Sequence, residues 1–477
     1  MPKTFVQYDK ELPYIEGREP YLRPNSYLRK TGKNAYEVVE GRRPSKMLLV
    51  NKLRKEVDRW REDGYPGASD TSAELMTFWF EQDHLVNGEK FVYYFCQREA
   101  METLIYLVEV KKFRDLEPVV YAYAENFQKD LFEKAVEIQV TPDGERYIRR
   151  YFPELDRETI QDFPEKNLLR YTFKMATGSG KTVVMAMAIV WSYFHKRREA
   201  GSELSDNFLV VAPNVIVFER LEKDFGSNRI FHELPLIPPG WDWNFKPIVR
   251  RDTSTPNPSG NIFVINIQQI YESREQEWTP ESALDAILGR PPQKDLSKAP
   301  ISALAHLKRL DNLMVLNDEA HHVHDDDLEW NKTLLMLHHT IPGGLSLWLD
   351  FSATPKNQAG AYYPWIIVDY PLAQAVEDRI VKAPLIVHRV DKVDPQDVTK
   401  ENVVQAYGDW ITAALERWRE HYSIYKEQGK KPVLFIMAEK TAFADKIYEF
   451  LLNDPDLKAS EILVIHTNTK GEIQKRD

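Results

Sequence analysis

The chain has 477 residues, of which 43% are hydrophobic and 29% charged, a composition typical of globular proteins and long enough for about three domains. Its formal net charge of −10 argues against binding nucleic acid over the whole surface, so any such site would be a local basic groove on an acidic body. The single cysteine, Cys96, excludes a disulfide framework. The sequence contains no signal-peptide core and no apolar stretch long enough to span a bilayer, so we expect a cytoplasmic protein.

The N-terminal part of the chain shows little regular patterning. The first 75 residues are polar and rich in proline, glycine and arginine, and they predict an irregular N-terminal region or a small accessory subdomain, an accessory region that we extend to 1–89. The apolar spacing over 90–112 predicts a helix. A mixed segment follows up to residue 165. VVYAYA and VEIQV are strand-like there, and the turn sequence PDG breaks the pattern after VEIQV.

From about residue 168 short β-rich runs alternate with helical segments. This rhythm predicts an α/β fold, in which a doubly wound parallel sheet is covered by helices on both faces. Two linkers, a proline-rich one over 234–260 and a polar one over 272–299, are predicted to be surface insertions. The predicted strands are LRYTFKM, FLVVAP, NIFVINI, LMVLND and LSLWLDF, and the helix VVMAMAIVWSYF follows the first of them.

A second α/β unit is predicted after Pro384. It would contain a helix over 403–422, the strand VLFIMA, the helix ADKIYEFLL and the strand ILVIH. These elements are too few for a complete doubly wound lobe, so we expect the second unit to be incomplete.

The sequence MATGSGKT, residues 175–182, follows a predicted strand and opens a predicted helix, as a phosphate-binding loop requires. Backbone N–H groups and the helix N-terminus would hold phosphate oxygens, and glycines let the backbone approach them closely. We expect Lys181 to reach the β- and γ-phosphates and Thr182 to place its hydroxyl on Mg²⁺. Met175 replaces the first glycine of the general pattern, and a chance glycine-rich turn is the alternative. The residues predicted to bind ATP are Thr177, Gly178, Ser179, Gly180, Lys181 and Thr182.

Two further motifs end apolar strands, at the edge of the sheet where α/β proteins bind ligands. In LMVLNDEAHH, Asp318 is expected to bind Mg²⁺ mostly through water and Glu319 to orient and deprotonate the attacking water. The polar tail over 322–327 predicts a surface loop rather than a metal site. In LDFSATP, Ser352 and Thr354 are small hydroxyl residues that suit a hydrogen bond to a neighbouring carboxylate or histidine.

The order MATGSGKT, DEAH, SATP resembles that of superfamily 2 DEAD/DEAH-box helicases. NDEAHH, NIFVINIQQ and DYPLAQAVEDRIVKAP are similar to sequences of the Res subunit of type III restriction enzymes, and the resemblance covers about residues 90 to 477. It implies a P-loop NTPase with a glutamine-motif helix and an insertion over 90–165, a first RecA-like lobe over 166–385 and a partial second RecA-like lobe over 386–477.

The resemblance also implies roles for single residues. Gln97 would read the adenine, because an amide both donates to and accepts from the edge of the base; a glutamine on the helix surface is the alternative. His321 would couple the state of the nucleotide to the rest of the motor. Two loop motifs are implied to contact DNA phosphates, although ordinary loop capping is also open, and their residues are Pro213, Asn214, Asn266, Gln268 and Gln269.

In the resembling enzymes, an arginine from late second-lobe motifs reaches the γ-phosphate. VLFIMA and ILVIHT resemble only the opening strands of that lobe, so we expect the 477-residue chain to hydrolyse ATP weakly. The resembling enzymes also carry a nuclease domain, usually beyond the second lobe. Asp83 with Glu109 and Lys111 has the spacing of a nuclease site, but Glu109 ends a predicted helix rather than a strand, so we expect this chain to lack a nuclease domain. The leading hypothesis is the ATP-binding motor portion of a restriction-type translocase. Its expected partners are double-stranded DNA and a modification (methyltransferase) subunit or the missing C-terminal portion. A helicase for DNA repair or RNA remodelling, and a truncated, non-catalytic nucleotide-dependent binding module, remain open as alternatives.

Overall fold

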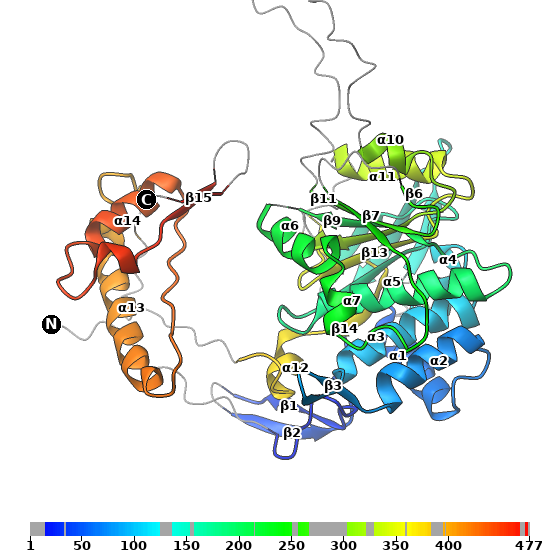
Figure 1. Ribbon diagram of the computed structural model, residues 1–477, viewed down its shortest axis with the longest axis horizontal. Coiled ribbons are helices and arrows are strands. Elements are labelled where there is room, and N and C mark those ends of the chain that lie inside the picture. Colours follow the sequence, from blue (N-terminus) through cyan, green and yellow to red (C-terminus); the bar gives the residue numbers. More distant parts are fainter. Residues whose placement is uncertain are drawn as a thin grey trace, which may run out of the picture. The chain divides into compact units, whose positions relative to one another are not determined.

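The computed structural model describes the chain in two compact units, a larger one within Glu11–Ala383 and a smaller one that contains Pro384–Asp477 (Figure 1). Each unit has its own hydrophobic core. The described residues are 15–32, 35–124, 136–152, 157–213, 215–249, 256–266, 303–320, 329–357, 360–382, 395, 397–467 and 473–475.

A seven-stranded sheet forms the centre of the larger unit, in the order β10-β11-β9-β12-β13-β8-β14. Every neighbouring pair is parallel, which confirms the predicted α/β fold class and its parallel sheet. Because the strands are parallel, the carboxyl ends of β8, β12 and β13 lie at one edge of the sheet. The strands are β8 (Arg170–Met175), β9 (Asn207–Ala212), β10 (Lys246–Val249), β11 (Asn261–Asn266), β12 (Met314–Asp318), β13 (Leu347–Ser352) and β14 (Ile366–Tyr370).

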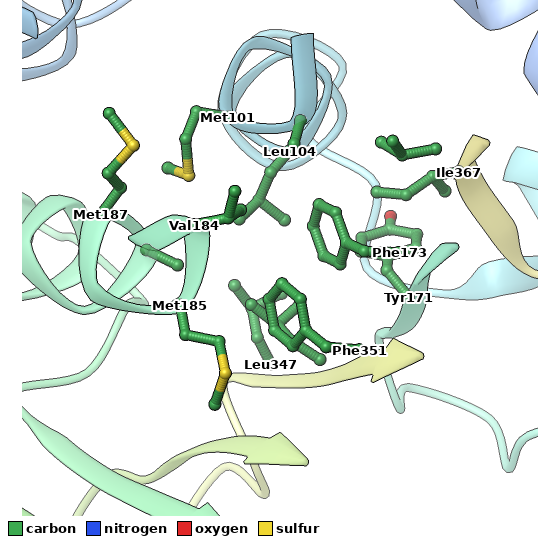
Figure 2. Close-up of a cluster of buried hydrophobic side chains, with 14 of the residues drawn as sticks. Met101, Leu104, Tyr171, Phe173, Val184, Met185, Met187, Leu347, Phe351 and Ile367 are labelled. Atoms are coloured by element: carbon green, nitrogen blue, oxygen red, sulfur yellow. The ribbon is translucent and has the colours of Figure 1, made fainter. Parts of the chain in front are cut away.

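Helices cover both faces of this sheet (Figure 1). One face packs against α5 (Lys181–Arg198) and α3 (Phe95–Ile105), and every side chain of α5 from Val184 to Phe194 is buried. Phe173 of β8 and Phe351 of β13 stack there with ring centroids 4.7 Å apart, facing side chains of α3 and α5 (Figure 2). The opposite face packs against α11 (Glu329–Thr340) and the short α10 (Ala303–Leu307). Two separate apolar layers therefore hold the sheet, as its nearly continuous apolar strands require.

The first 75 residues are more regular than expected. The strands β1 (Ser26–Lys30) and β2 (Tyr36–Glu40) form a hairpin, and the helices α1 (Val50–Glu62) and α2 (Asp70–Glu81) follow. The alternative of an irregular N-terminal region was wrong here because α1 is mostly charged, which concealed its helix; the alternative of a small accessory subdomain stays a prediction. The few apolar residues of α1 still line one side of the helix at helical spacing and join the main core, as Leu53, Val57 and Trp60 show.

The segment between α3 and β8 contains one correct and one wrong prediction. VEIQV forms β5 (Val136–Val140), which pairs with β6 (Arg146–Phe152) and β7 (Arg157–Asp162) in a small antiparallel sheet. VVYAYA was predicted as a strand but lies in α4 (Leu116–Tyr123). A run of β-branched and aromatic residues carries no clear period, and the Asp115 carboxylate, which accepts from the N–H of Glu117 at 2.8 Å, caps a helix instead.

The proline-rich linker over 234–260 also differs from its prediction. It contributes β10 to the edge of the sheet, together with the buried side chains of Leu236 and Phe245. Pro247 made the sequence of β10 look unlike a strand. Proline is tolerated on an edge strand, however, where the N–H that it lacks would face solvent rather than a neighbouring strand. The polar linker over 272–299 lies outside the described residues. Shorter elements are β3 (His84–Val86), β4 (Glu89–Phe91), a π-helical turn (Tyr106–Val110), α6 (Val215–Leu221), a second π-helical turn (Glu222–Gly226), α7 (Arg229–Glu233) and α12 (Leu372–Glu377).

The smaller unit is built on α13 (Val403–Lys426) and α14 (Thr441–Leu451), which confirms both predicted helices. A 3-10 turn (Ala459–Glu461) and a hairpin of β15 (Ile465–Thr467) and β16 (Ile473–Lys475) follow. VLFIMA was predicted as a strand, but within the described part of the chain it joins no ladder. Strand propensity does not create a strand without a partner for the backbone groups. Among the described residues, no helix combines the length and apolarity that crossing a bilayer requires.

Candidate functional site

A five-residue loop joins β8 to α5 at the carboxyl edge of the sheet. The N–H of Ala176 donates to the carbonyl of Tyr370 on β14 at 2.9 Å, which holds the start of the loop. The buried Ser179 hydroxyl donates to the Ala176 carbonyl at 2.7 Å and closes the loop on itself. Thr177 and Gly178 are exposed. The loop is thus fixed from inside while its outer residues remain accessible.

Gly180 is the N-cap of α5 and has a φ of 86°, in the left-handed region that favours glycine. A Cβ at this position would lie 2.2 Å from Nε2 of Gln97. The backbone conformation and the close approach of Gln97 therefore both select glycine where the loop turns into the helix.

Gln97 lies in the first turn of α3 and is only 4% exposed. Its amide nitrogen donates to the Ser179 carbonyl at 3.3 Å, and its amide oxygen accepts from the N–H of Tyr94 at 3.0 Å. The alternative of a glutamine on the helix surface is therefore wrong. Gln97 ties α3 to the loop, and reading of the adenine stays a prediction.

Lys181 and Glu319 meet across the site. Lys181 is the first residue of α5, Glu319 directly follows β12, and Lys181 Nζ lies 3.1 Å from Glu319 Oε1. Glu319 has a φ of 48°, a conformation that is uncommon for a residue with a side chain and that recurs at functional sites. Its N–H donates to Asp318 Oδ1 at 3.0 Å. The structure thus joins the loop to the carboxylate pair of the second motif.

The Asp318 carboxylate is fully buried and carries a contact that the sequence did not predict. Burial raises the pKa of Asp318, and the attraction of the Arg220 guanidinium opposes this shift. Arg220 belongs to α6 and donates to Asp318 Oδ2. Its only signal in the sequence is that it sits on the helix after β9, the strand beside β12.

In the third motif, LDFSATP, one of the two predicted hydroxyl residues is buried and the other is exposed. Ser352 ends β13 and is fully buried, and its hydroxyl accepts from the N–H of Thr354 at 3.1 Å. Thr354 is exposed. The strand itself carries a second unpredicted feature, the buried Asp350, which accepts from Arg170 Nε at 2.8 Å and from Asn317 Nδ2 at 2.8 Å. Asp350 therefore links β8, β12 and β13 next to the site.

The predicted DNA-contacting residues are only partly described. Pro213 follows β9 and is half-buried, whereas Asn266 ends β11 and is buried. Both lie at the same carboxyl edge as the loop, because all these strands are parallel. Asn214, Gln268, Gln269, His321 and the tail over 322–327 lie outside the described residues.

Comparisons with known proteins agree with this geometry. A protein-family model described as "Type III restriction enzyme, res subunit" matches residues 120–357, a range that contains the loop, Asp318, Glu319 and Ser352. A search of curated proteins finds no match. The domain that this family model describes is helicase-like. The seven-stranded parallel sheet with its loop after β8 is consistent with a RecA-like P-loop NTPase. Residues 120–357 of the chain therefore belong to the helicase-like type III restriction enzyme res-subunit family.

Proposed function

We propose that the chain is the motor portion of a restriction-type translocase, which binds ATP with Mg²⁺ at the loop between β8 and α5 and whose ATP hydrolysis drives movement along double-stranded DNA. One observation carries the proposal: Lys181 and Glu319, far apart in the sequence, meet at 3.1 Å beside the buried Asp318. A lysine at the start of a helix and a carboxylate pair at the end of a parallel strand are the groups that nucleotide hydrolysis needs.

The proposed roles follow from the position of each group. The phosphates would be held by the loop residues 177–180 and by the N–H groups at the start of α5. Lys181 would break its ion pair with Glu319 and contact the phosphate oxygens. Glu319 would then orient and deprotonate the attacking water. The ion pair with Lys181 thus keeps the base occupied while no phosphate is bound.

The groups near Asp318 fit a magnesium ion. Mg²⁺ prefers oxygen ligands, and in nucleotide sites it needs one or two protein groups because phosphates and water supply the rest. Asp318 offers a carboxylate and Thr182 a hydroxyl. When bound, Mg²⁺ would neutralise charge on the phosphate oxygens.

The remaining roles are proposed for groups of residues rather than for single contacts. Pro213, Asn266 and the neighbouring loop residues would contact DNA phosphates, and Ser352, Thr354 and His321 would couple the nucleotide to the rest of the motor. A modification subunit would supply sequence recognition. The boundaries at residues 89, 165 and 385 are proposed to separate accessory region, insertion, first lobe and second lobe.

The nucleotide site is tested by Lys181→Ala and Glu319→Gln. We expect Lys181→Ala to weaken binding of a fluorescent ATP analogue by at least about tenfold, because it removes a charged phosphate contact. Glu319→Gln should retain binding and lose hydrolysis by about 10²- to 10⁴-fold. Lys196→Ala is a matched control, since Lys196 lies near the other end of α5 and donates to the Ser202 carbonyl. Equal affinity of Lys181→Ala and the parent chain would refute the assignment.

The nucleic-acid substrate is tested by stimulation of ATP hydrolysis. We expect duplex DNA to stimulate more than single strands or RNA, with binding that weakens as salt rises, because phosphate contacts release counterions. Stimulation by RNA alone would favour the remodelling alternative. ATP binding without any stimulated hydrolysis would favour a nucleotide-dependent binding module.

A further inference from the structure

We infer that Arg220 is an exchangeable counter-cation of Asp318, which occupies this carboxylate in the nucleotide-free chain and is displaced when Mg²⁺ arrives with the nucleotide. The inference rests on the proposed function, because it assumes that Asp318 is the carboxylate that faces the metal. It assigns to Arg220, on α6, the task of making metal binding depend on nucleotide.

The two oxygens of Asp318 have different partners. Oδ1 accepts from the N–H of Glu319 at 3.0 Å, within the backbone of the motif itself. Oδ2 accepts from the Arg220 guanidinium. The carboxylate is fully buried, and a buried charge without a partner is costly. Arg220 therefore stabilises the ionised form of Asp318 at the oxygen that a metal ion would need.

The backbone of Arg220 is fixed by its helix, whereas about half of its side chain is exposed. Phe218 and Leu221 of α6 are fully buried and fix the helix against the sheet. The Arg220 side chain is 51% exposed, whereas that of Asp318 is 0% exposed. The guanidinium is therefore already partly hydrated and can leave once another cation replaces it, while the carboxylate stays buried. A π-helical turn begins directly after α6, a feature that is frequent at functional sites.

The charges of the site explain why nucleotide would favour the exchange. In the structure Asp318 is paired with Arg220 and Glu319 with Lys181, so each carboxylate already has a cation. A metal ion alone must break the first pair and gains no phosphate ligand. A nucleotide brings phosphate charge that attracts both displaced cations. Metal and nucleotide should then strengthen each other's binding, and Arg220 would account for part of that coupling.

The test uses Mn²⁺, a paramagnetic substitute for Mg²⁺, titrated into the full chain and followed by electron paramagnetic resonance. Without nucleotide, we expect Arg220→Gln to bind Mn²⁺ about tenfold more tightly than the parent chain, since the competing cation is gone. Arg220→Lys should stay within about twofold of the parent chain because it keeps a positive charge. With a non-hydrolysable ATP analogue, the difference between Arg220→Gln and the parent chain should shrink.

A matched control comes from Arg229, whose side chain is 49% exposed and pairs with Asp224, a carboxylate outside the site. Arg229→Gln should leave Mn²⁺ affinity unchanged. Arg220→Gln binding Mn²⁺ no more tightly than the parent chain would overturn the inference. Circular dichroism and thermal melting check that each variant folds, and Arg220→Ala serves as a second variant in which the cation is removed.

Asp318→Asn separates the two levels of the argument. If it loses Mn²⁺ while Arg220→Gln behaves like the parent chain, only the role of Arg220 is wrong. If Asp318→Asn keeps the affinity of the parent chain, the metal is bound elsewhere and the proposed function of Asp318 fails together with the inference.

Discussion

Gly180→Ala is expected to damage both the stability of the chain and its nucleotide site. Gly180 has a φ of 86°, and a left-handed conformation costs a residue with a side chain about 1 to 2 kcal/mol. The new methyl carbon would lie 2.2 Å from Gln97 Nε2, so the amide must move. That movement breaks its hydrogen bond to the Ser179 carbonyl, a further loss of about 1 kcal/mol. We therefore expect a total loss of about 2 to 3 kcal/mol in the free energy of unfolding.

Urea unfolding measures this loss, and a fluorescent ATP analogue reports the accompanying weakening of the site. Gly201→Ala provides a control for backbone strain alone, because Gly201 has a φ of 75° and open space where its Cβ would be. In a double-mutant cycle, Gln97→Ala should make Gly180→Ala less harmful by about 1 kcal/mol, since nothing remains to clash. The reasoning fails if Gly180→Ala costs no more than Gly201→Ala, or if the cycle shows no coupling.

Three further outcomes are expected. Asp350→Ala should lower the free energy of unfolding by about 3 to 5 kcal/mol, because it leaves the buried Arg170 guanidinium without its carboxylate partner; an unchanged urea midpoint would contradict this. Burial raises the pKa of Glu99, but the neighbouring Arg42 and other arginines outweigh it and lower that pKa to about 2. The contribution of Glu99 to the free energy of unfolding should therefore be fully present above the pKa of glutamate in the unfolded chain, about 4.3, and should disappear as pH falls towards 2. Glu99→Gln should reduce this pH dependence when unfolding is measured across an acid titration. Burial raises the pKa of the Cys96 thiol, so a thiol reagent should label it only on unfolding, and rapid labelling of the folded chain would refute its burial.

Local patterns were sufficient to identify the motifs and the main strands. The loop over 175–182 is recognisable because its glycines, lysine and threonine act within one turn, and its flanking strand and helix are β8 and α5. The apolar runs of the sheet were correctly placed because strands buried on both faces are apolar almost throughout. These features depend on neighbours in the sequence, so the sequence alone determines them.

Prediction failed where the outcome depends on a distant partner. VVYAYA carries strand propensity, yet burial against distant residues of the core favours a helix there. VLFIMA has the same propensity, but a strand requires hydrogen-bond partners that the sequence of one segment cannot supply. The charged composition of α1 concealed a narrow apolar side whose value appears only on packing.

The same division holds for the site. Its sequence determined the residue types: a lysine after a glycine turn, and an aspartate and a glutamate after an apolar strand. Only the tertiary structure decided which of them touch, because the parallel order of β8, β13, β12 and β9 brings their carboxyl ends to one edge. Lys181 thereby meets Glu319, and Arg220 meets Asp318. Such pairs join residues far apart in the chain, and their geometry is set by strand order, which no local pattern contains.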